Sequence, residues 1–163
     1  MIKILNDSIL LDEGEKVDVP NRILLANNKL IKCKGEINSY VELQDKLIIL
    51  IDTYHASNLF KSLSRNIFCY NKIDGSLKWQ VESKEGSPYV GIDLGIKKES
   101  GEVLYGERGV ITREGEWGKI ESCTYLTKPF QHGSDCISAQ TFSSGFYSVD
   151  IETGKVTFLY RDK

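Results

Sequence analysis
The residue types best suited to nucleophilic catalysis lie together in one short segment. His132, Ser134, Asp135 and Cys136 occupy five consecutive positions together with Gly133. A Ser-His-Asp or Cys-His catalytic set joins groups from separate elements in a fixed geometry, so closeness along the chain does not by itself indicate one. We interpret the segment as a polar loop before a strand, and the sequence predicts no catalytic residue.

Acidic residues form two further clusters, at 12–15 (Asp-Glu-Gly-Glu) and 114–116 (Glu-Gly-Glu). Paired carboxylates can bind a metal ion or act as acid and base. Neither cluster has the spacing of a calcium-binding loop, and the run 91–95 (Gly-Ile-Asp-Leu-Gly) lacks the strand and helix that flank a nucleotide-binding glycine motif. We therefore expect no metal and no cofactor. The clusters are interpreted as solvated turns, with recognition of a basic protein as the alternative.

Length and charge narrow the class of protein. The chain has 163 residues, which fits one domain over 1–163, and its 21 basic and 23 acidic residues leave a net charge of −2. A charge this small gives no field suited to a phosphate backbone, so a nucleic-acid partner is not expected. The longest purely aliphatic run, 47–51, is far too short to span a bilayer, so no membrane association is expected.

The four cysteines favour a reducing compartment. Cys33, Cys69, Cys123 and Cys136 form no CxxC pair and have no zinc-type spacing. The first residues show no secretory signal pattern. We expect free thiols in a cytoplasmic protein.

Four glycines recur at nearly equal intervals: Gly35, Gly75, Gly115 and Gly154 lie 40, 40 and 39 residues apart. Each stands between two stretches with the composition of strands, and no long helix is indicated. Repeats of about 40 residues, each with a strand–turn–strand unit, are typical of a propeller-like array of small antiparallel sheets. The sequence thus predicts an all-β fold of about four short antiparallel repeats.

The hairpins around Gly75 and Gly154 are the best defined. In each, we predict a three-residue loop in which the glycine takes the left-handed conformation. Asn71 and Asp150 take equivalent places beside the two turns, where an Asx side chain accepts turn amide hydrogens. The cross-strand pairs expected from these loops are Cys69 with Trp79, Ser148 with Phe158, and Phe146 with Tyr160.

Two weaker hairpins complete the predicted array. Ile31 should face Ile37 around Gly35, and Ile111 should face Trp117 around Gly115. Strands rich in β-branched and aromatic residues are expected at 23–25, 46–52, 66–72, 77–82, 89–96 and 155–160.

The stretches 66–82 and 146–160 resemble the strand–turn–strand repeat of the pyrroloquinoline-quinone-like (PQQ-like) and WD-like β-propellers. The PQQ-like repeat runs from an aromatic residue through a small and an aliphatic one to Asp or Asn, then through a turn ending in Thr-Gly to a strand with a central Trp. Residues 147–156 (YSVDIETGKV) follow this order, and the first copy follows it from Phe68 to Trp79. The resemblance implies a structural hairpin. It carries over no cofactor site, because cofactor-binding members have about six to eight blades and this chain has room for about four or fewer.

Two architectures are compatible with these repeats. The chain either closes into a small propeller or stops as an open, partial (half) propeller. The end sheets of an open form need charged or bulged edges, or a partner that covers them.

A small propeller-like domain without catalytic residues is best explained as a protein-binding domain. We predict a cytosolic immunity protein, an antitoxin that binds and neutralises a nuclease-type toxin in bacterial competition, and that is a monomer on its own. Such toxins are often basic because they hold nucleic acid, and this chain is mildly acidic. The alternatives are a scaffold or accessory subunit of a larger complex and, third, a propeller-type hydrolase.

The predicted partner-binding surface is one rim of the propeller, where the connections between strands gather. Aromatic and arginine side chains anchor interfaces because they bury much area and keep a polar group. The residues expected on this rim are Tyr54, His55, Phe60, Arg65, Glu85, Tyr89, Tyr105, Glu107 and Arg108. The acidic loop at 12–18 is the alternative surface.

Overall fold

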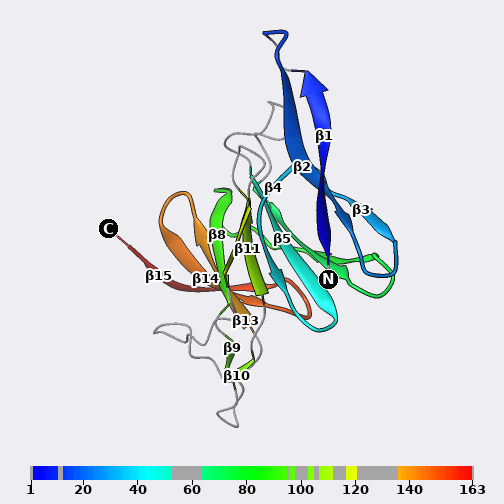
Figure 1. Cartoon of the computed structure of the whole chain (residues 1–163). Helices are drawn as coiled ribbons and strands as arrows, with labels where there is room; N and C mark the ends of the chain where they lie inside the picture. Colours follow the sequence, from blue (N-terminus) through cyan, green and yellow to red (C-terminus); the bar gives the residue numbers. More distant parts are fainter. Residues whose placement is uncertain are drawn as a thin grey trace.

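The computed structural model describes residues 2–10, 13–52, 64–94, 96–97, 103–104, 107–111, 117–120 and 136–162. Every element in these ranges is a β-strand, and every strand pairing in them is antiparallel (Figure 1). The all-β prediction is confirmed.

The strands form sheets of three, six, four and two strands. The three-stranded sheet contains β1 (Lys3–Leu10), β2 (Lys16–Leu24) and β3 (Leu30–Lys32). The six-stranded sheet contains, in spatial order, β12 (Trp117–Ile120), β11 (Glu107–Ile111), β4 (Glu36–Glu42), β5 (Lys46–Asp52), β6 (Ile67–Asn71) and β7 (Leu77–Gln80). The four-stranded sheet contains β15 (Val156–Arg161), β14 (Gly145–Asp150), β13 (Cys136–Thr141) and β8 (Tyr89–Leu94). The small pair is β9 (Ile96–Lys97) with β10 (Val103–Leu104).

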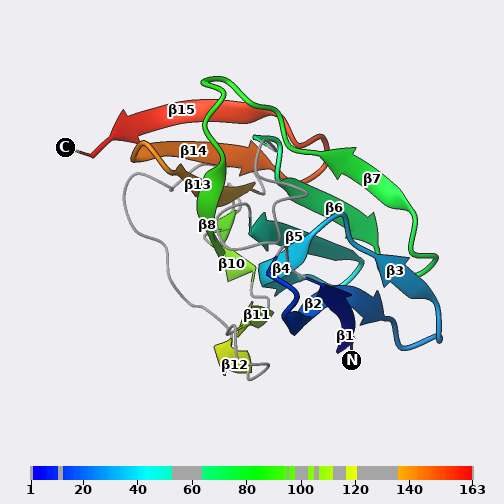
Figure 2. The ribbon, with the colours of Figure 1, turned by 90° about the horizontal axis from the view of Figure 1, so that it is seen from above.

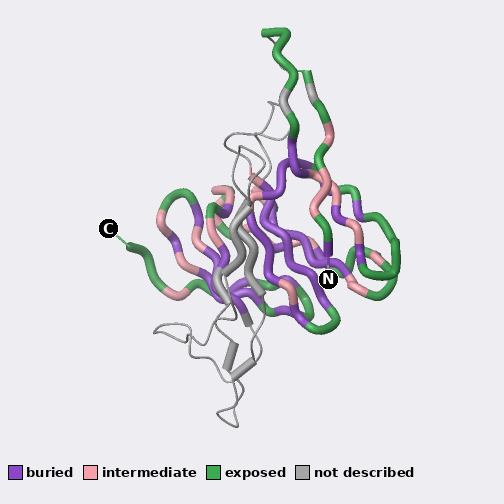
Figure 3. The backbone as a smooth tube through the Cα atoms, viewed as in Figure 1, coloured by how far each residue is buried: buried purple, intermediate pink, exposed green. Residues whose placement is uncertain are grey.

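The six-stranded sheet lies between the other two large sheets, and its strands β4, β5 and β6 are buried on both faces (Figures 2 and 3). Its strand β5 shows how. Ile48 and Leu50 belong to the core shared with the four-stranded sheet, and Leu47, Ile49 and Ile51 belong to the core shared with β1–β3. A strand buried on both faces needs no polar alternation, which explains the aliphatic run of β5. Each fully buried Leu or Ile side chain contributes about 1.5–3 kcal/mol to folding.

The turns at Gly75 and Gly154 have the predicted left-handed backbone, with φ of 76° and 75°. Asn71 and Asp150 also take the predicted role, because Oδ1 of each accepts the amide hydrogen of the residue two positions ahead, at 2.7 and 2.8 Å. The predicted loop length was one residue too short: the amide of Asn71 donates to the carbonyl of Ser76. Each loop therefore has four residues, and a bulge in the following strand changes the register.

The bulges decide which predicted pairs are found. Cys69 pairs with Trp79 as predicted, because the register shifts between Cys69 and Tyr70. Phe146 pairs with Tyr160 for the same reason. The prediction for Ser148 was wrong: its partner is Thr157, because the shift in this hairpin lies beyond it, between Phe146 and Tyr147.

The outer two glycines of the predicted array do not mark equivalent units. β3 pairs with β2 and not with β4, so the Ile31–Ile37 hairpin was wrong; the turn before β3 uses Asn28, with φ of 66°. Ile111 and Trp117 do pair as predicted, in β11 and β12. That hairpin extends the six-stranded sheet at β4 and is not a separate sheet. The described strands thus form three stacked sheets in place of four repeats around the four glycines.

Candidate protein-interaction surface
The β1–β2 hairpin projects from the stacked sheets as a two-stranded ribbon (Figure 1). β3 pairs with β2 only at positions 22–24, so residues 6–10 and 13–18 have no third strand beside them in the described structure. We call these residues the arm. Most of the arm is exposed to solvent (Figure 3).

The base of the arm is held by a small polar cluster. Asp7 forms an ion pair with Arg22 at 2.8 Å and accepts a hydrogen bond from Asn21 Nδ2 at 2.8 Å. Pro20, opposite Asn6, has no amide hydrogen to give to the strand ladder. Arg22 Nη2 donates to the Asn6 carbonyl at 2.7 Å. A lone two-stranded hairpin is marginally stable in water, so these contacts at its base help to fix its direction.

The tip of the arm is acidic and partly apolar. Residues 13–18 contain three acidic residues and one lysine, a net charge of −2 (one minus three). Glu13, Glu15 and Asp18 are exposed and form no ion pair with any described residue. Leu10 is 66% exposed. An exposed patch of one charge sign beside an apolar side chain suits recognition of a basic protein surface.

The predicted rim residues are only partly described. Tyr54, His55, Phe60 and Tyr105 lie outside the described residues. Glu107 and Arg108 begin β11, where their backbones pair with Glu42 and Val41. The side chains of the other three rim residues contact other residues of the fold. These three are Arg65, Glu85 and Tyr89.

Tyr89 lies in the core, so its ring is not part of the predicted binding surface. Its side chain is 3% exposed, packs edge-on against Tyr147 and donates its hydroxyl hydrogen to the Glu82 carbonyl at 2.8 Å. Burial raises the pKa of this phenol. The backbone of Tyr89 is held by the buried Asn66, whose amide group bonds both its N–H and its C=O. Asn66 also donates to the Ile51 carbonyl, so it joins the two larger sheets.

Glu85 is the centre of a polar network and not a free surface charge. Its carboxylate accepts hydrogen bonds from Thr141 Oγ1 at 2.8 Å, Tyr147 Oη at 2.5 Å, Arg161 Nη2 at 2.6 Å and the Ser143 hydroxyl. Burial alone would raise the pKa of Glu85, but these bonds lower it from its usual 4.5 to about 2. Burial, together with the bond to Glu85, raises the pKa of Tyr147 to about 12. The network ties the β7–β8 connection to the β13–β14 turn and β15.

Arg65 is exposed, and part of its hydrogen-bonding capacity is used within the fold. Its Nε donates to the Val81 carbonyl at 2.9 Å, and its Nη2 approaches the Gln80 carbonyl at 3.4 Å. Its charge is still accessible to a partner. Compared with Glu85 and Tyr89, Arg65 is the more accessible residue and therefore fits the predicted surface best.

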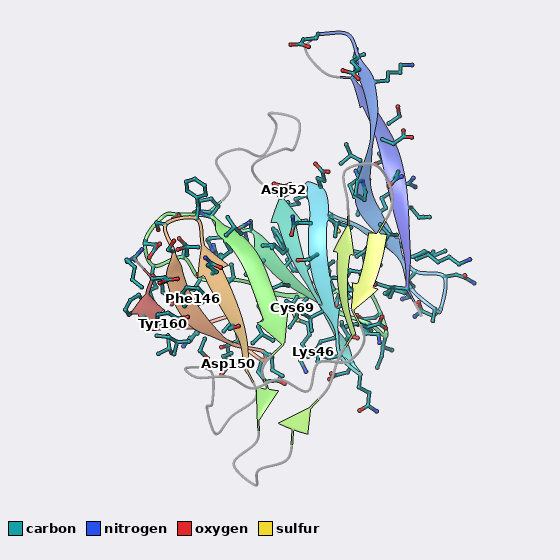
Figure 4. The ribbon with its side chains drawn as sticks, turned by 60° about the vertical axis from the view of Figure 1, so that its left-hand side comes forward. Lys46, Asp52, Cys69, Phe146, Asp150 and Tyr160 are labelled. Carbon is teal, nitrogen blue, oxygen red and sulfur yellow. The ribbon has the colours of Figure 1, made fainter. Side chains whose placement is uncertain are left out.

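Lys46 is a buried charge that the sequence did not single out. Figure 4 labels Lys46, at the start of β5. Its side chain is 6% exposed and forms ion pairs with Asp45 at 3.0 Å and Glu152 at 2.9 Å. Burial by itself would lower the pKa of Lys46, but the hydrogen bonds that its ammonium group donates to Glu152 and Asp45 raise it. The group links the start of β5 to the β14–β15 turn, and we assign it a structural role.

The described cysteines and the possible metal ligands do not combine into a site. Cys33 and Cys69 are free and buried, as predicted, and burial raises the pKa of each thiol to about 12. No three His, Cys, Asp or Glu residues of the described ranges come together as a metal site. The same ranges contain no helix of the length and hydropathy needed to cross a membrane.

The arm is the feature that the sequence located least well. The acidic loop at 12–18 was recognised as an alternative surface, but the strand β1 and most of β2 were not expected. Gly14, with φ of 85°, flanked by acidic residues between two mixed apolar runs, is the signal that could have indicated a hairpin.

No family model, no curated protein and no solved structure matches the chain.

Proposed function
We propose that the chain is a non-catalytic protein-binding domain, and specifically an immunity protein that binds and neutralises a basic, nuclease-type toxin. The observation that carries the proposal is the arm: a projecting ribbon whose tip, residues 13–18, has a net charge of −2 and lies beside the exposed Leu10. Nuclease toxins are basic where they bind a phosphate backbone. A protruding acidic element can enter the groove in which the toxin would hold its nucleic acid, and block it.

We also propose that the stacked sheets are a partial propeller, left open at both ends. Two four-stranded meanders support this interpretation: β4–β5–β6–β7, and β8–β13–β14–β15 with an insertion between its first two strands. Each ends in a hairpin with the same glycine turn and the same Asx hydrogen bond. An experimental structure in which these two hairpins are not related by rotation about a common axis would contradict the interpretation.

The function is tested by co-expression. A nuclease-toxin gene adjacent to the gene for this chain is expressed in a bacterium with and without it, and growth is followed. Neutralisation restores growth, and the purified pair forms a complex that protects DNA or RNA from cleavage. Normal toxicity in the presence of the folded chain, with every adjacent toxin tested, would reject the immunity function and favour the scaffold alternative.

A matched pair of variants connects the function to the arm. Glu13→Lys reverses one exposed charge at the tip, and Glu82→Lys makes the same change beside the exposed Lys84, where an ion pair is worth little. We expect Glu13→Lys to weaken neutralisation and Glu82→Lys to leave it near wild type. Equal effects of the two changes would point to net charge alone and not to the arm.

A further inference from the structure
The strand β1 is an open edge. It is the end strand of its sheet, and in the described part of the chain it pairs only with β2. Open edges recruit other strands unless proline, charge or a bulge protects them. β2 has such protection along the arm, with Pro20 and the extra residue Asn21. β1 contains neither a proline nor a bulged residue, and its two charged residues, Lys3 and Asp7, have opposite signs, so they do not repel a second copy of the strand.

The side chains of β1 show which strand would fit. Ile4 packs against the core, so by alternation Lys3, Leu5 and Asp7 lie on the opposite, outer face. Lys3 is exposed and forms no ion pair or hydrogen bond with any described residue, and Leu5 is half-buried. Asp7 uses one oxygen for Arg22 and the other for Asn21, and each oxygen can accept a further bond.

We propose that this edge pairs with β1 of a second copy of the chain, antiparallel and around a two-fold axis beside Leu5. In this register Leu5 faces the partner's Leu5, and Lys3 lies opposite the partner's Asp7. The symmetry repeats the ion pair on the other side. The two three-stranded sheets thereby become one continuous six-stranded sheet.

Charge selects this register among its neighbours. An axis beside Asp7 would place two carboxylates opposite each other, which is unfavourable across a strand pair. An axis beside Asn6 would leave Lys3 opposite an isoleucine and Leu5 opposite a carboxylate. Only the Leu5 axis combines an apolar centre with two opposite-charge pairs.

The pairing is compatible with the proposed function but does not depend on it. It uses residues 3–7, so the acidic tip at 13–18 stays accessible. The sequence analysis predicted a monomer, without β1 among its expected strands. The open edge is the reason to revise that expectation.

The test is the oligomeric state of the whole chain. Sedimentation equilibrium on the wild type, over protein concentrations from about 0.5 to 50 μM, should show a monomer–dimer equilibrium with a Kd of about 1 μM. Lys3→Asp places a carboxylate opposite the partner's Asp7 and should raise the dimer Kd by about tenfold or more. Lys155→Asp, an equal charge change at an exposed position just before β15, should leave the Kd nearly unchanged.

Amide hydrogen exchange locates the contact. In the dimer, every second amide over residues 3–7 should exchange more slowly than in Lys3→Asp diluted below its own Kd, where that variant is monomeric, with β2 unaffected. A wild type that stays monomeric at about 0.5 mM would overturn the proposal, since a Kd of about 1 μM gives almost only dimer at this concentration. So would a dimer that responds equally to Lys3→Asp and Lys155→Asp, or whose protected amides lie outside β1.

Discussion
The indole ring of Trp79 packs directly on the backbone of Gly154, and the two residues come from the two similar hairpins. A Cβ atom added to Gly154 would come within 2.5 Å of Trp79 Cε3. The indole Nε1 donates to the Ile151 carbonyl at 2.8 Å, in the same turn. The tryptophan of the first hairpin therefore links it directly to the second, and only glycine fits beneath it.

Gly154→Ala should destabilise the fold more than Gly75→Ala. Both positions have positive φ, which costs an alanine about 1–2 kcal/mol. At Gly154 the new methyl group also meets the indole ring, which adds about 1–3 kcal/mol of overpacking. At Gly75 the nearest atoms, on Leu25 and Ile31, would be 3.6 Å away, an ordinary contact. Urea unfolding of both variants measures the difference, and equal losses would show that the indole yields easily.

Trp79→Ala should lower the free energy of unfolding by about 3–5 kcal/mol, because it removes a large core side chain. Trp79→Phe should cost less, but it leaves the Ile151 carbonyl without its indole donor, at about 1–3 kcal/mol. In a Trp117→Phe background, Trp79 emission should be blue-shifted in the native state, because the side chain is 7% exposed. Emission typical of full exposure would contradict the packing.

Glu85 should make the fold sensitive to acid. A carboxyl group whose pKa falls on folding stabilises the protein above its unfolded pKa, and this contribution is lost as the pH drops through the folded value. For Glu85 the window runs from 4.5 down to about 2. Glu85→Gln should be less stable than wild type by about 2 kcal/mol at neutral pH, from weakened charge-assisted bonds. The gap should narrow as the pH falls through this window, and a gap independent of pH would show that ionisation is not involved.

Cys33 and Cys69 should resist alkylation in the folded protein. The thiolate is the reactive form, and burial raises the pKa of both thiols to about 12. Iodoacetamide at pH 8, followed by peptide mass spectrometry, should modify these two positions only after denaturation. Rapid labelling of Cys69 under native conditions would mean that the strand pair with Trp79 opens readily.

The sequence predicted best where a local rule decides the structure. The aliphatic run 46–52 is a doubly buried strand, and Asn71 and Asp150 cap their turns as their spacing to the following glycine indicated. The contact between Trp79 and Gly154 could not be predicted in this way, because it joins residues far apart in the chain. Equal spacing of glycines misled at Gly35, which lies between two strands that do not pair, β3 and β4; the nearby hairpin turn, between β2 and β3, uses Asn28.

The arm was missed because its pattern is ambiguous. In β1 the apolar residues occur as adjacent pairs, Ile4-Leu5 and Ile9-Leu10, separated by three polar residues. This order lacks the alternation of a half-buried strand, since much of β1 has solvent on both faces. The burial of Tyr89 was missed for a different reason. Tyrosine side chains occur both in interfaces and in cores, so the residue type alone does not distinguish the two.

The last prediction concerns how the tip of the arm finds a basic partner. Exposed charges at the rim of an interface act mainly on the association rate, by steering, and salt screens them. Glu13→Lys and Glu15→Lys should therefore slow association with a basic toxin domain severalfold at low ionic strength, with little effect at about 1 M salt, where the Debye length is about 3 Å. Leu10→Ser removes an exposed apolar side chain and should instead speed dissociation. Surface plasmon resonance at two salt concentrations separates the rates. The melting temperatures of all three variants should stay near that of the wild type, because neither the two carboxylates nor Leu10 has a described polar or charged partner. Association rates that ignore both charge reversals would move the interface away from the tip, to the rim that includes Arg65.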